Sequence, residues 1–128
     1  MRSFKQFITE SITTRQSFKV KTVRPSDGNT FLEGLMHETN IPDDTGMFFI
    51  FEDENYHGIW MKNTHIPLDV VWINESGTIV DIATLQPHDM QTTMPKQPAK
   101  YILEVNAGEF QGKVGDHVDR VGNTIRVL

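Results

Sequence analysis

Hydrophobic and polar residues alternate along much of this chain, which is the pattern of β-strands with one buried face. In residues 17–23, Phe18 and Val20 alternate with lysines, so this segment is predicted to be a half-exposed strand. Further alternating or continuously apolar segments predict strands over residues 47–51, 58–62, 68–73, 78–82, 100–106 and 124–128. About seven short strands separated by turns favour a mainly β single domain, either a jelly-roll-like β-sandwich or a small barrel.

Turn-forming residues separate these strands. Residues 74–77, Asn-Glu-Ser-Gly, predict a hairpin because Gly77 can adopt the positive φ that such a loop requires. Residues 52–55 are charged or polar and predict a turn, and residues 86–98 contain three prolines and predict a long loop. Residues 30–37 have the capping pattern of a short helix, so one or two short helices should accompany the strands.

The first residues differ from the rest of the chain. Residues 1–16 are basic, and their apolar side chains recur at helical spacing, so they predict an amphipathic leader before a β domain of residues 17–128. The apolar face of this leader consists of Phe4, Phe7, Ile8 and Ile12. The segment lacks the apolar run of a secretory signal, and no stretch of the chain approaches the ~20 apolar residues of a transmembrane helix.

Charge and cysteine content exclude several classes of function. Residues 1–24 carry six Lys/Arg and only Glu10 as an acidic residue, whereas the rest carries six Lys/Arg and sixteen Asp/Glu. An acidic domain of this kind repels phosphate backbones. We therefore expect no nucleic-acid partner unless the leader supplies the contact. Because the chain has no cysteine, thiolate catalysis, disulfides and cysteine-bound zinc are excluded.

The densest group of candidate functional residues lies in residues 60–69. Trp60, Asn63, Thr64 and Asp69 interleave an aromatic ring with amide, hydroxyl and carboxylate groups, which suits recognition of a small molecule or a glycan. The alternative interpretation is structural, with the apolar residues packing and the polar ones satisfying backbone groups at strand ends. The leading hypothesis is a non-enzymatic binding or accessory domain.

Two carboxylates within apolar strands suggest an alternative function. Asp69 and Glu104 would both be buried, and two such carboxylates facing one cavity would suit a hydrolase. Glu104 is therefore also a candidate binding residue. The histidines lack the short paired spacing of metal ligands, so we predict no metal and no cofactor unless distant loops assemble a site. The five histidines are His37, His57, His65, His88 and His117.

Several ordered motifs resemble one protein family. They are Gly34-Leu-Met36, residues 46–51, Trp60 to Asp69, and residues 103–108 followed by Gly115-Asp116. Together they resemble the uncharacterised bacterial and archaeal family called domain of unknown function 192, over roughly residues 17–128. The resemblance implies a mainly β, jelly-roll-like fold and implies no activity.

The leader resembles a different group of proteins. Residues 1–10 are similar to N-terminal segments of proteins encoded by large tailed phages, and Ile8-Thr9-Glu10 before Ser11 is similar to the site that prohead proteases cut. This resemblance implies a particle-associated phage protein, in the virion or the host cytoplasm, whose leader docks on a capsid partner and is removed after Glu10. An amphipathic helix folded on its own domain is the alternative.

Overall fold

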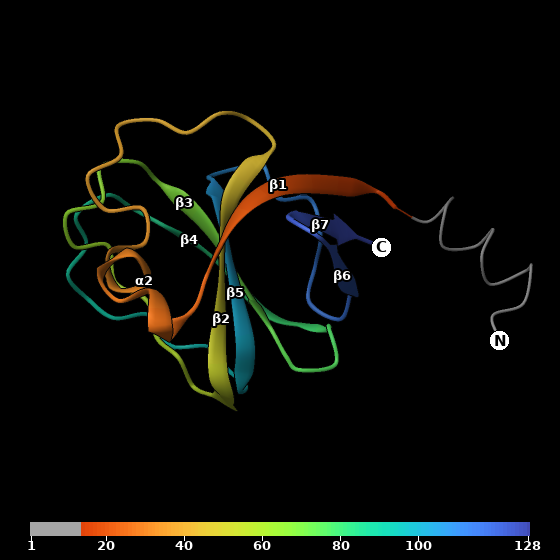
Figure 1. Ribbon diagram of the computed structural model, residues 1–128. Helices are drawn as coiled ribbons and strands as arrows, with labels where there is room; N and C mark the ends of the chain where they lie inside the picture. Colours follow the sequence, from red (N-terminus) through yellow and green to blue (C-terminus); the bar gives the residue numbers. More distant parts are fainter. Residues whose placement is uncertain (1–13) are drawn as a thin grey trace, which may run out of the picture.

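The computed structural model of the protein describes residues 14–128 as one mainly β unit (Figure 1). The leader prediction for residues 1–13, including processing between Glu10 and Ser11, lies outside the described residues and stays a prediction. The elements in chain order are strand β1 (Gln16–Val23), the 3₁₀ turn η1 (Pro25–Asp27), the short helix α2 (Asn29–Glu33) and strands β2 (Thr45–Asn55), β3 (Leu68–Ile73), β4 (Ile79–Leu85), β5 (Ala99–Asn106), β6 (Val118–Val121) and β7 (Thr124–Val127).

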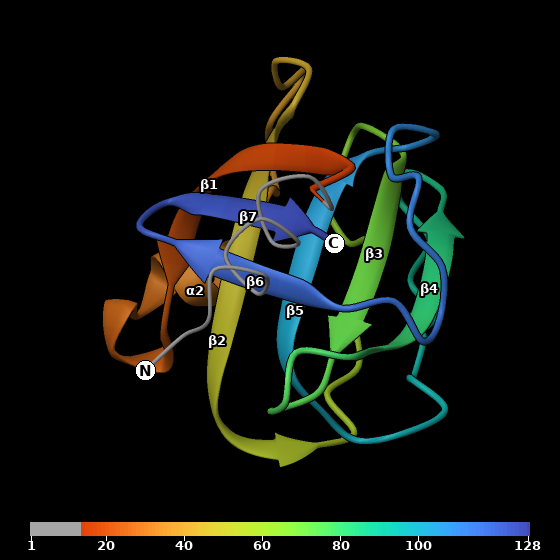
Figure 2. The same cartoon turned by 90° about the vertical axis from the view of Figure 1, so that its right-hand side faces the viewer.

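All seven strands form one sheet in the order β4-β3-β5-β2-β1-β7-β6. Only the β1–β2 pair is parallel, and every other neighbouring pair is antiparallel. The sheet curls, so that β1, β7 and β6 cross in front of β2, β5 and β3 when seen from the side of the C-terminus (Figure 2). The mainly β prediction is confirmed, but the structure has one curled mixed sheet, and the two-sheet jelly-roll is not confirmed.

The curled sheet buries apolar residues on both faces, which explains why all six residues of β3 are buried. The inner core lies inside the curl and contains Phe18, Val20, Phe48, Val71, Ile73, Ile79, Leu103, Val105, Val118, Ile125 and Val127. The outer core lies on the opposite face and contains Val23, Leu35, Met47, Phe49, Met61, Leu68, Val70, Trp72, Val80, Ala99 and Ile102. Leu35 from the segment around α2 and Met61 from the loop before β3 belong to this core, and partly buried residues of the same two segments pack against it, so loops rather than a second sheet complete it.

The β3–β4 hairpin agrees with its prediction, because Gly77 has φ 90° in the turn between the two strands. The prediction of a turn at residues 52–55 is wrong, because these residues continue β2, which resumes pairing with β5 at Asn55 after an irregularity. The prediction of a strand at residues 58–62 is also wrong, because this segment forms only an isolated bridge, between Ile59 and Thr93. Strand β6 was not predicted, because its short sequence Val-Asp-Arg-Val buries only Val118.

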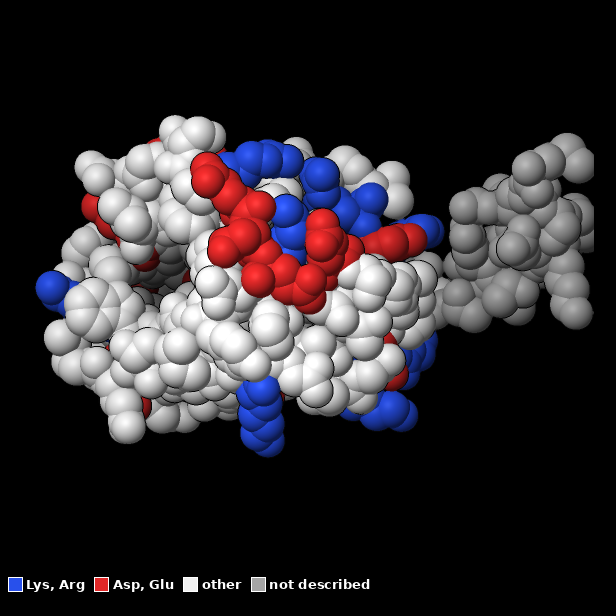
Figure 3. Space-filling view, turned by 90° about the horizontal axis from the view of Figure 1, so that it is seen from below, with Lys and Arg blue, Asp and Glu red and all other residues white. Residues whose placement is uncertain are grey.

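Charged side chains of both signs share one face of the molecule. Seen from below, acidic side chains gather in a band bordered by Lys and Arg, and the left side of this face is hollowed (Figure 3). The face therefore offers no continuous basic patch to a phosphate backbone. Among residues 14–128, no helix is long and apolar enough to cross a membrane.

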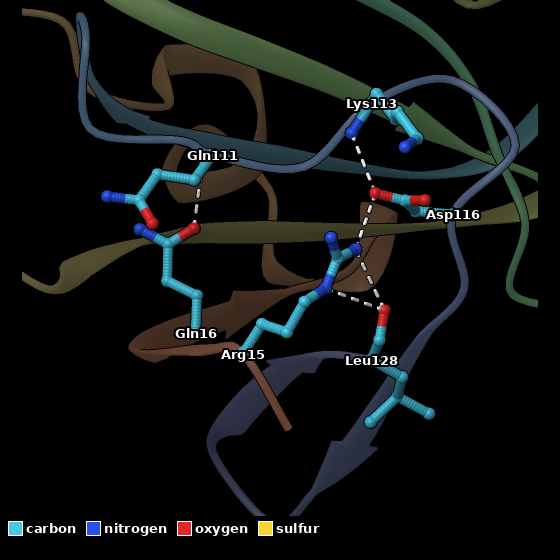
Figure 4. Close-up of polar contacts among 6 residues, drawn as sticks. All are labelled: Arg15, Gln16, Gln111, Lys113, Asp116 and Leu128. Atoms are coloured by element: carbon cyan, nitrogen blue, oxygen red, sulfur yellow. Dashed lines mark hydrogen bonds and ion pairs between the residues drawn. The ribbon is translucent and has the colours of Figure 1, made fainter. Parts of the chain in front are cut away.

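Polar contacts fasten the start of β1 to the C-terminal part of the chain (Figure 4). The Arg15 guanidinium donates to the carbonyl oxygen of Leu128 at 2.9 Å and to the Asp116 carboxylate at 2.6 Å. Gln16 donates to the carbonyl of Glu109 and accepts the amide hydrogen of Gln111. The hydrogen bond from Arg15 lowers the pKa of Asp116 below its ordinary value of 3.8. Two residues at the end of the predicted leader thus contact the β domain directly.

Candidate functional site

A pocket of about 160 Å³ opens on the outer face of the sheet, between the segment that includes α2 and the loop before β3. These elements lie on the left in Figure 1, and the left side of the face drawn in Figure 3 is hollowed. The pocket is lined by Phe31, Leu32, Glu33, Gly34, Leu35, Met36, Phe49, Phe51, Gly58, Ile59, Trp60, Met61, Thr64, Leu68 and Glu104. Most of these side chains are apolar, as in ordinary sites for small organic molecules.

Glu104 is the buried charged group of this pocket. It pairs with Met47 of β2 on one side and Val70 of β3 on the other, and both neighbours belong to the outer core, so its side chain points to that face. Only 5% of Glu104 is exposed, and its carboxyl group forms no hydrogen bond or ion pair with any described residue. Burial raises the pKa of Glu104 from 4.5 to about 7, because removal from water disfavours the ionised form.

Gly34 covers the Glu104 carboxyl group at the end of α2. It has φ 55°, and its amide closes the helix by donating to the carbonyl of Thr30. A Cβ at this position would lie 3.6 Å from Oε1 of Glu104 and 3.0 Å from the ring of Phe49. The glycine therefore lets the backbone turn closely over the carboxylate without filling the pocket.

Aromatic rings form much of the pocket wall. Phe31 makes edge-on contacts with Phe49 and Phe51, at ring-centre distances of 5.8 and 5.1 Å. Trp60 is 43% exposed at the rim, and the Nζ of Lys62 lies 5.1 Å from its ring centre. The sequence-based prediction did not include these phenylalanines, although the Phe-rich segment of β2 and the position of Phe31 in the predicted helix were visible signals.

The predicted binding residues separate in the structure. Trp60, Thr64 and Glu104 line the same pocket, whereas Asn63 and Asp69 do not. The Thr64 hydroxyl donates to the carbonyl of Lys62 at 3.1 Å, so it also stabilises its own turn. Asn63 is exposed with φ 54°, and its backbone carbonyl accepts the amide hydrogen of His37.

Asp69 stabilises the loop that follows β5. Its carboxylate accepts the hydroxyl hydrogen of Thr84 at 2.7 Å and the amide hydrogens of Gly108 and Phe110 at 2.9 and 3.1 Å. Asp69 is paired with Val105, the neighbour of Glu104 in β5, so the two carboxylates point to opposite faces of the sheet. This geometry gives the paired-carboxylate hydrolase no support.

Three of the five histidines lie together beside the pocket. Nδ1 of His65 is 3.3 Å from Nε2 of His88, and the ring centre of His37 is 6.4 Å from that of His65. Backbone hydrogen bonds hold these loops together, since the amides of His37 and His88 donate to the carbonyls of Asn63 and Thr64. These histidines are far apart in the sequence, so their proximity could not be predicted from it. Within residues 14–128, no group of three or more metal-ligating side chains has the geometry to hold a metal ion.

A larger depression of about 460 Å³ lies on the inner side of the curl. Its floor includes the stacked rings of Phe48 and Tyr101, 5.4 Å apart, and its rim carries charged groups of both signs. One of these, Asp119, already pairs with Arg126. Since no charged side chain lining this depression is buried, it provides less reason to expect a specific ligand than the pocket at Glu104.

Comparison with known proteins identifies the family. The model of the domain of unknown function 192, described as "Uncharacterized ACR", matches residues 8–120. The chain belongs to this family. Proteins from Pyrococcus furiosus and Pyrococcus abyssi, each named a UPF0127 protein, are 33% identical to this DUF192 chain over 66 residues. Those matches cover 49% of this chain and 53% and 52% of the two relatives, so they span about half of each relative's length.

Two solved structures have the same fold. A protein of unknown function from Novosphingobium aromaticivorans DSM 12444 is 30% identical, with a TM-score of 0.74 over 80% of this chain and 75% of that chain. A protein from Sinorhizobium meliloti 1021, named as a proposed transcription regulator, is 33% identical, with a TM-score of 0.71 over 77% of this chain and 78% of that chain. Four of the motifs that resemble DUF192 converge in space, because residues 34–36, 46–51, 60–69 and 103–108 all contribute lining residues to the Glu104 pocket, whereas Gly115-Asp116 does not.

Proposed function

We propose that this DUF192 protein is a non-enzymatic binding domain that takes a small organic molecule into the pocket beside Glu104. One observation carries the proposal: a carboxyl group that is almost wholly enclosed has no hydrogen-bond partner among the described residues. A buried polar group without a partner destabilises the folded protein. Its position at the wall of a pocket favours a ligand as the missing partner.

The dimensions and lining of the pocket favour a small molecule. At about 160 Å³ it is smaller than the ~300–1,000 Å³ typical of sites for drug-sized ligands, so it suits a molecule of a few heavy atoms or one end of a larger one. The apolar wall supports a ligand with a hydrocarbon part. The exposed ring of Trp60 would cover that part at the rim.

Binding is favoured over hydrolysis by the surroundings of Glu104. Asp69 lies on the opposite face of the sheet with three hydrogen-bond donors of its own, so it does not provide the second carboxylate of an acid–base pair. The remaining acidic lining residue, Glu33, is exposed.

A titration with the neutral probe 1-butanol tests whether the pocket accepts a ligand. Amide resonances of the isotopically labelled protein should shift and saturate at Gly34, Met36 and Ile59, with an affinity on the order of millimolar for so small a probe. Trp60→Ala should weaken binding. Tyr56→Ala is the matched control, because Tyr56 is a similarly exposed aromatic residue of the same loop that does not line the pocket. Shifts that centre on another part of the protein would refute the proposed site, and so would the absence of saturating shifts both with 1-butanol and with a charged analogue of the same length.

A further inference from the structure

The Glu104 pocket also indicates the chemical class of its ligand. Resting on the proposed function above, we infer that the ligand presents a primary ammonium group on a short apolar stem, with Glu104 as its counter-ion. The inference comes from three properties of the pocket: the sign of its charge, the hydrogen-bonding capacity of Glu104, and the aromatic residues in its wall.

The charge of the pocket lining has a single sign. Glu33 and Glu104 are its charged residues, and no Lys or Arg of the described chain lines it. The nearest basic side chain along the sequence, Lys62, is exposed and lies against the ring of Trp60 rather than in the pocket. A pocket with two carboxylates and no basic lining residue attracts cations and repels anions.

Glu104 has unused capacity to accept hydrogen bonds from a ligand in the pocket. An ionised carboxylate only accepts hydrogen bonds, and none of the described residues donates one to Glu104. A primary ammonium group brings three N–H donors and a positive charge, and such charge-assisted bonds are stronger than neutral ones. Thr64 provides further acceptor capacity at the same pocket, because its hydroxyl hydrogen is used by the Lys62 carbonyl and its oxygen remains able to accept. A quaternary ammonium ion would satisfy the charge but would donate no hydrogen bond.

The aromatic wall suits a cation on a hydrocarbon stem. Faces of aromatic rings attract ammonium groups, and four aromatic residues line this small space. They are Phe31, Phe49, Phe51 and Trp60. Met61 and Leu68, both almost completely buried, complete an apolar surface for the methylene groups. A free alkylamine and the side chain of a lysine in a peptide share this chemistry, so the experiment must distinguish them.

The experiment compares two ligands of equal length that differ in charge, and adds a blocked lysine as a third probe. The probes are n-butylamine, 1-butanol and Nα-acetyl-lysine amide, each titrated at pH 8.0 and pH 5.5 and followed by amide chemical shifts. An alkylammonium titrates near the lysine value of about 10.4, so the amine stays protonated at both pH values. At pH 8.0, n-butylamine should bind about 10- to 100-fold more tightly than 1-butanol, as expected for one buried charge-assisted contact.

This advantage should depend on the ionised form of Glu104. Because the pKa of Glu104 is raised to about 7, most of the advantage should be lost at pH 5.5, where the carboxyl group is protonated. Other titratable groups near the pocket are Glu33 at the rim and His57, whose ring stacks on Phe51 at 3.8 Å. Glu104→Gln should abolish both the preference for the amine and its pH dependence. His57→Gln, as a control, should retain both, because His57 does not line the pocket.

The possible outcomes separate this inference from the proposed function. If neither n-butylamine nor 1-butanol binds in the pocket, the proposed function fails and the ammonium inference fails with it. Equal affinities for the two probes would leave the proposed function standing and overturn the ammonium inference. An amine preference that persists in Glu104→Gln would also overturn it, since another group would then be the counter-ion. Preferential binding of n-butylamine supports the ammonium inference. If Nα-acetyl-lysine amide also binds, the side chain of a lysine in a peptide can supply the ammonium group.

Discussion

Glu104→Gln should stabilise the protein at alkaline pH and give no such gain at acidic pH. Below pH 4.5 the carboxyl group is protonated in both the folded and the unfolded chain, so its burial carries no ionisation penalty. As the pH rises from 4.5 to about 7, the folded state binds more protons than the unfolded state, so the free energy of unfolding falls. The difference between 4.5 and about 7, at about 1.4 kcal/mol for each pH unit, gives a penalty of about 3 kcal/mol above pH 7.

Urea unfolding at pH 4.0, 5.5, 7.0 and 8.5 measures this penalty, with circular dichroism as the signal. Glutamine is neutral at every pH, so the difference in unfolding free energy between Glu104→Gln and the parent protein should grow by about 3 kcal/mol from pH 4.0 to pH 8.5. An unpaired carboxamide adds a contribution that does not vary with pH, so the change across the pH series is the decisive quantity. Glu33→Gln should show little variation, since Glu33 is exposed. A constant difference for Glu104→Gln across the series would refute the reasoning.

Four further substitutions test other contacts. Gly34→Ala and Gly28→Ala should each lose more than the ~1–2 kcal/mol of a left-handed helical residue, because both glycines combine a positive φ with ψ −124°, a conformation that favours glycine. In thermal unfolding Gly34→Ala should lose more than Gly28→Ala, because its Cβ would lie 3.0 Å from a phenylalanine ring, while that of Gly28 meets nothing within 4 Å. Equal losses would contradict the close packing. Asp69→Ala should cost about 3 kcal/mol or more in urea unfolding, since two amides and a hydroxyl lose their acceptor, and a loss under about 1 kcal/mol would contradict that role. Arg15→Gln should reduce the free energy of unfolding at pH 7 but not near pH 2. The stabilisation from the Arg15–Asp116 pair is present above the unfolded Asp116 pKa of 3.8 and disappears as the pH falls through the lower folded pKa. An equal loss of unfolding free energy at both pH values would argue against the ion pair.

The sequence predicts those strands whose pattern reflects local burial. β1 alternates between exposed lysines and buried apolar residues, and the β3–β4 hairpin follows from a glycine-containing turn between apolar segments. The curl of the sheet could not be predicted in this way. It depends on the parallel pairing of β1 with β2 and on β7 adding to the other edge of β1, which are contacts between segments far apart in the chain.

The candidate site was predicted only in part, for a related reason. Trp60, Thr64 and Glu104 were singled out because polar and aromatic groups within apolar segments are unusual, and all three line the pocket. Asp69 met the same criterion but accepts hydrogen bonds from a distant loop. Residues 58–62, Gly-Ile-Trp-Met-Lys, contain a short apolar run like that of a strand, but Ile59 and Met61 pack on the outer core from a loop. An apolar run indicates burial and does not show whether a neighbouring strand is present.

The hydrogen bonds from Arg15 to Leu128 have a practical consequence for work on this protein. They place the beginning of β1 beside the last residue, on the side of the molecule away from α2 (Figures 1 and 2). A biotin tag or fluorescent reporter joined after Leu128 would therefore leave the opening at Trp60 unobstructed. Immobilising the protein on a sensor chip through that end should accordingly preserve amine binding, whereas random coupling through lysines would place Lys62, next to Trp60, against the chip surface in some molecules.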